Sequence, residues 1–503
     1  MTQADADRKP DEGAPRLSPS QATNYALGGI AQNIMGNVLN QLVYPIFSDG
    51  LGLSKWMVSL GFGIPRVLDA IIDPWIGHLS DNHRGRFGRR KPFMFAGGAL
   101  SAIAFAFLWL PASGGWGTTE TFIWFMVFTT LFYIGFGLFN IPYSALAYEI
   151  AETGRSRTRL LTYKNIIIVI ASVPLSMTLI LCMYDWGALL EPGSIWDRCQ
   201  ALTAPVSEDS GAQSSQLPLG GIMVVGAIVG VLIFISALAP LLCRETRITE
   251  GQPHGSLWAT IKESIRCPPF LLLNIGIVLA FIGVFLVMPM AFYVNLHYVY
   301  SGDMVKAGIM TSAVGIMQGI VGVVASLVTA WLLNRIGAYR GMLLCLLVVI
   351  ASHIMTYWMY TPANPWLQLI PMGIWVFAWT GVMLAYQVML GDCCDYDELQ
   401  TGLRRQGSFS AVTAFLTKIA IGITQALAGL VLASSGIVEG AVRQSESTIS
   451  LLRYEYAIIP SLCIGLAFVV FLKYPLRGNR PEEIRDELRR RHSMGTLPAH
   501  PGA

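Results

Sequence analysis

The chain has 503 residues, of which 53% are hydrophobic and only 13% are charged, with a formal net charge of +3. A water-soluble globular protein carries roughly 25% charged residues, so this chain lacks the polar groups to cover a water-facing surface. The composition excludes a soluble globular protein, gives no indication of a nucleic-acid partner, and predicts an all-α membrane protein embedded in a lipid bilayer.

Apolar runs follow one another along the chain, each of about 20 residues and long enough to cross ~30 Å of hydrocarbon as a helix. They predict twelve transmembrane helices, at 24–46, 56–80, 93–111, 121–147, 160–184, 219–243, 269–293, 306–333, 341–360, 365–390, 409–435 and 452–475. The polar residues before the first run contain no signal peptide, so the first span is expected to act as its own insertion signal.

A polar stretch between the sixth and seventh runs divides the chain into two halves. The predicted units are a disordered cytoplasmic N-terminus (1–23), an N-terminal six-helix bundle (24–243), a central cytoplasmic loop (244–268), a C-terminal six-helix bundle (269–475) and a cytoplasmic tail (476–503). Two such bundles predict a binding site between the halves. In the tail, a proline, then acidic residues, then arginines predict a surface helix over 481–491, which we interpret as solvated.

Lysine and arginine are distributed unevenly between alternate loops. If both termini are cytoplasmic, the cytoplasmic segments hold 26 of these residues and the outer loops hold five. This bias predicts cytoplasmic termini and a multi-pass protein of the cell (inner or plasma) membrane. Cys182 and Cys199 are both predicted to face outside, and the sequence leaves open whether they pair.

Asp69 and Asp73 are the sharpest chemical signal in the spans. They lie four residues apart near the middle of the second span, so both face one side of the helix. Each charge there costs about 2.5–3.5 kcal/mol, and the two repel each other. Arg66, Lys418 or a bound monovalent cation can neutralise the pair. A fixed salt-bridge cluster is the alternative, but buried ionisable groups in membranes usually mark function.

A basic loop and an acidic segment are predicted to meet at the cytoplasmic rim. Ion pairs between the loop 81–92 and the segment 391–405 would hold an inward gate shut, although the same charges also suit orientation and solvation alone. The predicted gate residues are Asp81, Arg86, Arg89, Arg90, Asp392, Asp395, Arg404 and Arg405.

Polar and aromatic residues inside the spans are candidates for solute binding, because amides bind sugar hydroxyls and aromatic faces stack on sugar rings. The alternative for any single amide is helix-to-helix contact. The candidates are Gln32, Asn33, Arg66, Asn140, Tyr143, Lys164, Asn165 and Tyr386. No Walker, nucleophile-elbow or metalloprotease pattern occurs, so we expect neither an ATP-driven pump nor an enzyme, and no cofactor.

Four stretches together resemble the glycoside–pentoside–hexuronide:cation symporter family, the relatives of melibiose permease within the major facilitator superfamily. They are Pro65–Pro74, the loop 81–92, Asn140–Leu146 and Gly391–Gly407 followed by Lys418. The resemblance covers roughly 24–475 and implies the two-bundle fold of that superfamily. It also implies a symporter, whose partners are a small solute and a monovalent cation, Na+ or H+.

The resemblance also assigns roles to individual residues. Asp69 and Asp73 match the two carboxylates that bind the coupling cation, and Lys418 matches a lysine close to that site. Asn33 and Asn140 match two acidic positions that hold the sugar in melibiose permease. The Asn140 position is a neighbour of the cation site as well.

The departures from the family pattern fall on residues that the resemblance assigns to solute binding. Asn33 and Asn140 are amides here, Ser144 replaces a tryptophan, and Lys164-Asn165 lies where the family places an arginine. A melibiose-type galactoside pocket is therefore not expected. We expect instead a sugar, glycoside or uronide that is held by amides and Lys164. The animal sodium-dependent lysophospholipid symporters share the aspartate pair and a Thr-Lys pair, so a lysophospholipid-like solute is the alternative. A third possibility is an uncoupled facilitator, which would transport its solute without a cation gradient.

Overall fold

The computed structural model describes residues 18–83, 85–150, 154–183, 186, 220–243, 264–402, 406–438 and 444–494, and nearly all of them are helical. The elements of the first half are α1 (Pro19–Val43), η2 (Tyr44–Gly50), α2 (Lys55–Asn82), α3 (Lys91–Leu108), η3 (Leu110–Ser113), α4 (Thr118–Ile150), α5 (Gly154–Ser176), α6 (Thr178–Met183), α8 (Gly220–Leu238) and η5 (Ala239–Leu242). Those of the second half are α10 (Pro268–Leu286), α11 (Met288–Tyr293), η6 (Val294–Val299), α12 (Met304–Ile336), α13 (Ala338–Met359), η7 (Pro365–Gln368), α14 (Leu369–Thr401), α15 (Gln406–Ser434), α16 (Glu446–Leu472) and α17 (Arg480–Met494).

A helix lies over each predicted apolar run. Ten helical segments of the described chain are long and apolar enough to cross a membrane, which confirms a multi-pass, all-α membrane protein. The helices α1 and α2 are not among the ten. Amides interrupt the apolar sequence of α1, and Arg66, Asp69 and Asp73 fall within a single stretch of α2. These polar residues lower the hydropathy of α1 and α2 relative to the ten segments.

Some predictions fall partly or wholly outside the described residues. Residues 1–17 and most of the central loop are not described, and neither is Cys199, so its pairing with Cys182 stays a prediction. The disordered N-terminus was predicted to extend to residue 23. This boundary is wrong, because residues 19–23 are helical. Pro19 begins α1, at a first-turn position where the missing N–H of proline carries no cost.

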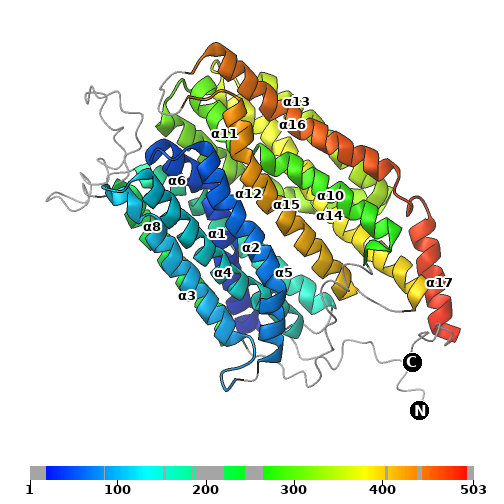
Figure 1. Cartoon of the computed structure of the whole chain (residues 1–503). Coiled ribbons are helices and arrows are strands. Elements are labelled where there is room, and N and C mark those ends of the chain that lie inside the picture. The colour runs from blue at the N-terminus through cyan, green and yellow to red at the C-terminus, as the bar shows by residue number, and fades with distance from the viewer. Residues whose placement is uncertain are drawn as a thin grey trace.

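The helices of each half pack mainly on one another (Figure 1). In the first half α3 lies against α4 and α8, and α1 lies against α5 and α8; in the second, α13 lies against α14 and α16. The pairs α2 with α15 and α5 with α12 make the largest contacts between the halves, and α6 also contacts α12. The pair α2 and α15 runs side by side through the centre of the molecule, so it forms the seam along which the halves meet.

Glycines allow this seam to close. A Cβ atom added at Gly63 of α2 would lie 2.6 Å from the Cα of Ala426, and one at Gly422 of α15 would lie 2.9 Å from the backbone nitrogen of Val67. Neither distance leaves room for a side chain. The two backbones therefore touch directly, as small residues allow between membrane helices.

The helix α14 is longer than its apolar run, which ends near residue 390. It continues through the acidic segment to Thr401 and ends at Gly402, whose left-handed φ of 70° suits glycine. Asp392, Asp397 and Glu398 are buried on this extension. The acidic segment is thus helical as far as Thr401, and three of its acidic residues are buried against other parts of the protein.

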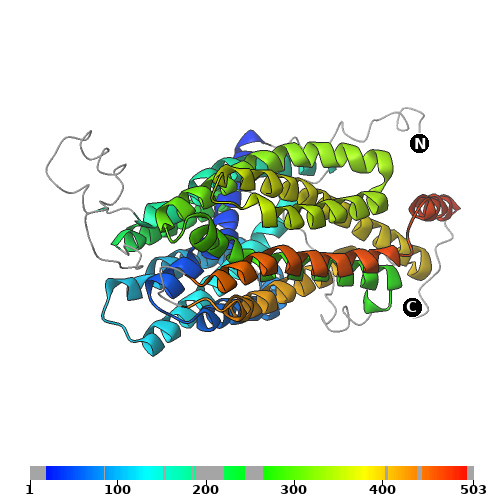
Figure 2. The same ribbon diagram turned by 90° about the horizontal axis from the view of Figure 1, so that it is seen from above.

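The tail helix α17 covers part of that extension. The helix predicted over 481–491 is confirmed, but it is not fully solvated, because Ile484 and Leu488 are only 3% and 6% exposed. Arg485 lies 3.4 Å from Asp392, and Arg491 donates a hydrogen bond to the carbonyl oxygen of Leu399. Figures 1 and 2 together show α17 at one end of the long helices and running across them.

The substitution Leu488→Asp is expected to detach α17 from α14. Burying a leucine contributes about 1.5–3 kcal/mol, so its loss raises the undocked population by roughly tenfold or more. Proteolysis within 473–494, by a protease that does not cut at arginine, should accelerate by a similar factor. The control Arg489→Gln changes a side chain that is 80% exposed, and its proteolysis rate should match wild type. Equal rates for both variants would show that α17 is not held by its apolar face.

Candidate functional site

The two predicted carboxylates meet a lysine from the opposite half at the seam. Asp69 and Asp73 lie one turn apart on α2, and Asp69 is only 1% exposed. The Nζ atom of Lys418 on α15 lies 3.0 Å from Oδ2 of Asp69 and also contacts Oδ2 of Asp73. One ammonium group thus bridges both carboxylates and links α2 to α15.

Arg66 supplies a second positive charge to the same cluster. Its Nη1 atom lies 3.7 Å from Oδ2 of Asp69, and its guanidinium lies 4.8 Å and 5.5 Å from the ring centres of Tyr133 and Phe136 on α4. Two carboxylates are therefore balanced by two cations. A further cation at this site must displace Lys418 or exchange with a proton, since burying a net charge is costly.

The other oxygen of each carboxylate points at Gly137 of α4. The Oδ1 atoms of Asp69 and Asp73 are buried and accept no hydrogen bond in the described structure. Each would lie 3.0 Å from a Cβ atom added at Gly137. Two unpaired carboxylate oxygens that converge on one position fit a small hard cation, or a proton shared between them.

The predicted solute residues on α1 and α4 are paired with each other. The side-chain amide of Gln32 donates a 2.5 Å hydrogen bond to Oδ1 of Asn140, and Ser144 lies 3.5 Å from the same oxygen. Asn33 accepts a 2.9 Å bond from Asn37 one turn further along α1. Gln32 and Asn140, two of the predicted solute residues, thus come together. Within the described residues, the Asn140 side chain hydrogen-bonds with Gln32 and Ser144 and not with the carboxylates.

Lys164 and Tyr143 also come together, whereas Asn165 and Tyr386 lie elsewhere. The Nζ atom of Lys164 lies 5.3 Å from the ring centre of Tyr143. Tyr143 is fully buried, stacks on Tyr25 at 4.6 Å and donates its hydroxyl to the Tyr25 carbonyl oxygen, so in this conformation it packs and presents no ring face. Asn165 is exposed, and Tyr386 is buried in the core of the second half.

The predicted gate residues are described only in part. Arg404 and Arg405, and the side chain of Asp81, lie outside the described residues. Arg86 is exposed over the ring of Phe87, Arg89 and Asp395 are half-buried, and Arg90 is buried before α3. Asp392 pairs with Arg485 of α17, a partner that the prediction did not include. Ion pairs between the two halves at this end stay a prediction.

A polar cluster at the opposite end of the seam was missed. Asp49 of η2 lies 3.6 Å from the Nζ atom of Lys55 and accepts a 2.7 Å hydrogen bond from the hydroxyl of Tyr293 on α11. Lys55 is only 2% exposed and lies 4.9 Å from the ring centre of Tyr293. The cluster ties the two halves together. Its only signal in the sequence was a lone lysine and an aspartate in one short loop.

Removing the hydroxyl of Tyr293, with Tyr293→Phe, is expected to loosen this end. A hydrogen bond to a charged group contributes about 1.5–3 kcal/mol. The population of molecules in which the two halves have separated at this end should therefore rise roughly tenfold or more. Amide hydrogen exchange in 44–59 and 288–299 should accelerate accordingly, while that of α13 stays unchanged. The matched control is Tyr163→Phe, at a tyrosine that is 43% exposed. Unchanged exchange in Tyr293→Phe would contradict a closing role for the contact.

Solved structures of transporters share this fold of two helix groups that meet at a seam. A crystal structure of a D-xylose-proton symporter matches with a TM-score of 0.61 at 15% identity, covering 90% of this chain and 97% of that chain. A nucleoside transporter matches with a TM-score of 0.60 at 13% identity, covering 90% and 100%. The fold is that of the major facilitator superfamily.

The family follows from the sequence comparison. Residues 24–478 match the family described as MFS/sugar transport protein, and the chain belongs to the glycoside–pentoside–hexuronide:cation symporters of this superfamily. The glucuronide carrier protein homolog of Escherichia coli (strain K12) is 25% identical over 95% of this chain and 97% of that protein. The isoprimeverose transporter of Lactiplantibacillus pentosus is 22% identical, covering 94% and 92%. The chain is therefore a transporter and not an enzyme.

One relative has a lipid in its name. The sodium-dependent lysophosphatidylcholine symporter 1-A of Danio rerio is 23% identical, covering 91% of this chain and 86% of that protein. The resemblance to that group noted from the aspartate pair is thus confirmed at the level of sequence similarity.

Proposed function

We propose that this protein is a cation-coupled symporter that imports a sugar, glycoside or uronide by alternating access, with Na+ or H+ as the coupling ion. The observation that carries the proposal is the contact of Lys418 with both Asp69 and Asp73 across the seam. In this proposal α1 and α2 also cross the membrane, which gives twelve spans with cytoplasmic termini in the cell membrane. The bundles 24–243 and 269–475 are the units that move.

The coupling follows from the charge balance of the cluster. A cation that binds Asp69 and Asp73 competes with Lys418, because both carboxylates are already balanced. Displacing Lys418 breaks the ionic link between α2 and α15, so cation binding changes how the halves fit together. A solute that prefers the new arrangement then binds more tightly when the cation is present, and the effect is reciprocal.

The solute class is supported by the side chains near this cluster and by the relatives. The Gln32–Asn140 pair and Asn33 offer donors and acceptors suited to hydroxyl groups. Lys164 is a half-buried cation suited to a carboxylate such as that of a uronide. The relatives named as a glucuronide carrier protein homolog and an isoprimeverose transporter support the same class. A lysophospholipid-like solute is the second candidate, supported by the fish symporter.

Transport by the purified protein in proteoliposomes tests the proposal. Uptake of radiolabelled glycosides and uronides should rise when an inward Na+ or proton gradient is imposed, and should fall when it is collapsed. Thermal stabilisation by sugars, but not by lysophosphatidylcholine, should accompany it. Counterflow that ignores both gradients would identify an uncoupled facilitator. Stabilisation by lysophosphatidylcholine alone would identify the lipid transporter.

A further inference from the structure

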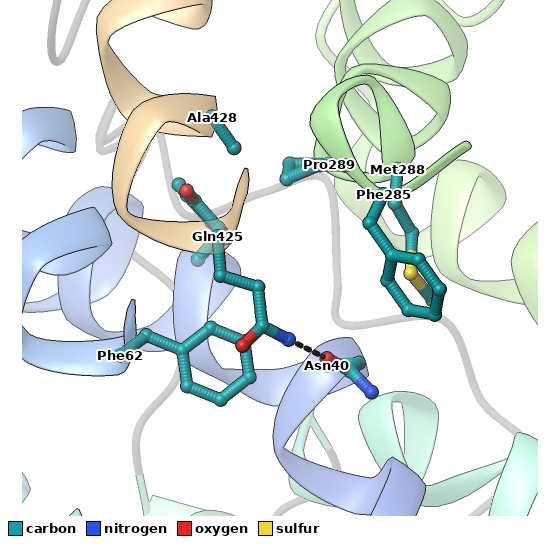
Figure 3. A pocket seen from close by; sticks show the side chains of 8 residues that line it. Asn40, Phe62, Phe285, Met288, Pro289, Gln425 and Ala428 are labelled. Atoms are coloured by element: carbon teal, nitrogen blue, oxygen red, sulfur yellow. Dashed lines mark hydrogen bonds between the residues drawn. The ribbon is translucent and has the colours of Figure 1, made fainter. Parts of the chain in front are cut away.

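The pocket that Figure 3 shows at the seam is nearly closed. Nε2 of Gln425 donates a 3.0 Å hydrogen bond to Oδ1 of Asn40, which joins the two halves across it. The room that remains suits about one water molecule and no larger solute. The outer surface of the second half carries a different feature, a group of exposed cations at the end of the molecule where α17 lies.

This group, the basic patch, consists of four side chains from three helices. They are Arg335 at the end of α12, Arg340 at the start of α13, and Lys473 and Arg477 just after α16. The rings of Tyr339 and Tyr474 stack with their centres 6.2 Å apart, which brings the start of α13 beside the end of α16. Since each of these tyrosines is the sequence neighbour of a cation, Arg340 and Lys473 lie side by side.

The segment after α16 is anchored so that its cations face outward. Exposed and buried residues alternate along it, because Tyr474 and Leu476 are only 1% and 3% exposed while Lys473 and Arg477 are exposed. The hydroxyl of Tyr474 also lies 3.3 Å from Sγ of Cys393 on α14. The buried residues therefore fix the segment to the second half, and the charges stay at the surface.

The basic patch has no acidic partner among the described residues. Arg335 lies over the ring of Trp331 at 4.5 Å, and Arg477 donates a 3.4 Å hydrogen bond to the carbonyl oxygen of Leu472. The ion pairs described at this end instead join arginines of α17 to acidic residues of α17 and α14. Several positive charges gathered without a described counter-charge attract an anion.

Exposed apolar residues lead along one face of each helix to its cation, at intervals of three or four residues. They are Leu327 and Trp331 before Arg335 on α12, Leu344 and Leu347 after Arg340 on α13, and Leu466 and Val469 before Lys473 on α16. Trp331 is 54% exposed, and exposed tryptophan is typical of the boundary between hydrocarbon and headgroups. Apolar residues, then tryptophan, then a cation match the order of acyl chain, glycerol and phosphate in a phospholipid.

We propose that the basic patch binds the phosphate group of an anionic phospholipid, whose acyl chains lie along the exposed apolar faces of α13 and α16. Arg340 and Lys473 contact the phosphate, and Arg335 and Arg477 add to the positive charge around it. With the orientation proposed above, this lipid belongs to the cytoplasmic leaflet. The site is separate from the seam and goes beyond the proposed function, because it does not depend on which solute is transported.

Native mass spectrometry of the purified protein, titrated with dioleoylphosphatidylglycerol or dioleoylphosphatidylcholine, tests the site. Each lysine or arginine near an anionic lipid contributes about fivefold to affinity, so the double variant Arg340→Gln with Lys473→Gln should bind phosphatidylglycerol roughly 25-fold more weakly than wild type. Its affinity for phosphatidylcholine, which has no net charge, should stay within about twofold of wild type. Wild type should bind phosphatidylglycerol more tightly than phosphatidylcholine, and this preference should shrink as salt is added.

The matched control is the double variant Lys306→Gln with Arg489→Gln. It removes the same amount of charge from side chains that are 68% and 80% exposed and lie outside the basic patch, so its affinity for phosphatidylglycerol should equal that of wild type. An equal loss in both double variants, or no loss in Arg340→Gln with Lys473→Gln, would overturn the site. Displacement of phosphatidylglycerol by an equal concentration of sn-glycerol 3-phosphate would also overturn it, because the patch would then bind a soluble anion and not a lipid.

Discussion

Replacing Asp73 with asparagine is expected to abolish cation-driven uptake and leave expression and membrane insertion intact. Asparagine nearly matches aspartate in shape, but it removes one of the two charges that Lys418 contacts. Lys418 and Arg66 then place two positive charges beside the single negative charge of Asp69, so the site no longer attracts a further cation. Since breaking a buried ion pair costs about 3–5 kcal/mol, gradient-driven accumulation should fall roughly 100-fold or more. Radiolabelled uptake into proteoliposomes measures it.

The matched control for this variant is Asp303→Asn, far from the cluster in sequence. Asp303 caps α12 by accepting a 3.0 Å hydrogen bond from the backbone of Lys306, and asparagine caps a helix equally well. Its uptake should equal wild type. Cation-dependent accumulation that is undiminished in Asp73→Asn would remove that carboxylate from the coupling mechanism.

Valine at Gly422 is expected to stop transport by holding the seam apart. Its Cβ atom would lie 2.7 Å from Cγ2 and 2.9 Å from the backbone nitrogen of Val67, and a backbone atom cannot move aside alone. Overpacking of this kind costs about 1–3 kcal/mol or more, and alternating access depends on states of similar energy. A shift of ~3 kcal/mol changes the ratio of states by roughly 100-fold, so uptake should fall by a comparable factor.

Solute binding separates a blocked cycle from an unfolded protein. Gly422→Val should still bind the solute that stabilises the wild type, because the helices are moved and not removed. Gly63→Val, which meets the Cα of Ala426 at 2.6 Å, should behave in the same way. The control is Gly465→Val on α16, where no atom lies within 4 Å of the added Cβ. Wild-type uptake by both seam variants would mean that α2 and α15 need not touch during transport.

Features set by local sequence were predictable. Each apolar run became a helix, because a chain in hydrocarbon must satisfy its backbone hydrogen bonds within the segment. Asp69 and Asp73 were placed on one face by their spacing alone. The helix over 481–491 followed from its terminal residues. The length of α14 was not predictable, because its acidic end is helical where α17 covers it, and hydropathy does not register such a contact.

The sequence by itself determined the class of protein, the helical spans and the paired carboxylates, because these depend on residues that are neighbours along one helix. The tertiary structure decided which charged and polar side chains contact one another. Lys418 reaches Asp69 across 349 residues, and Tyr293 reaches Asp49 across 244. It also converted Tyr143 from an expected solute contact into a packing residue. The physical reason is that these contacts are set by how helices from the two halves pack together, and the period of a single helix carries no information about its partner.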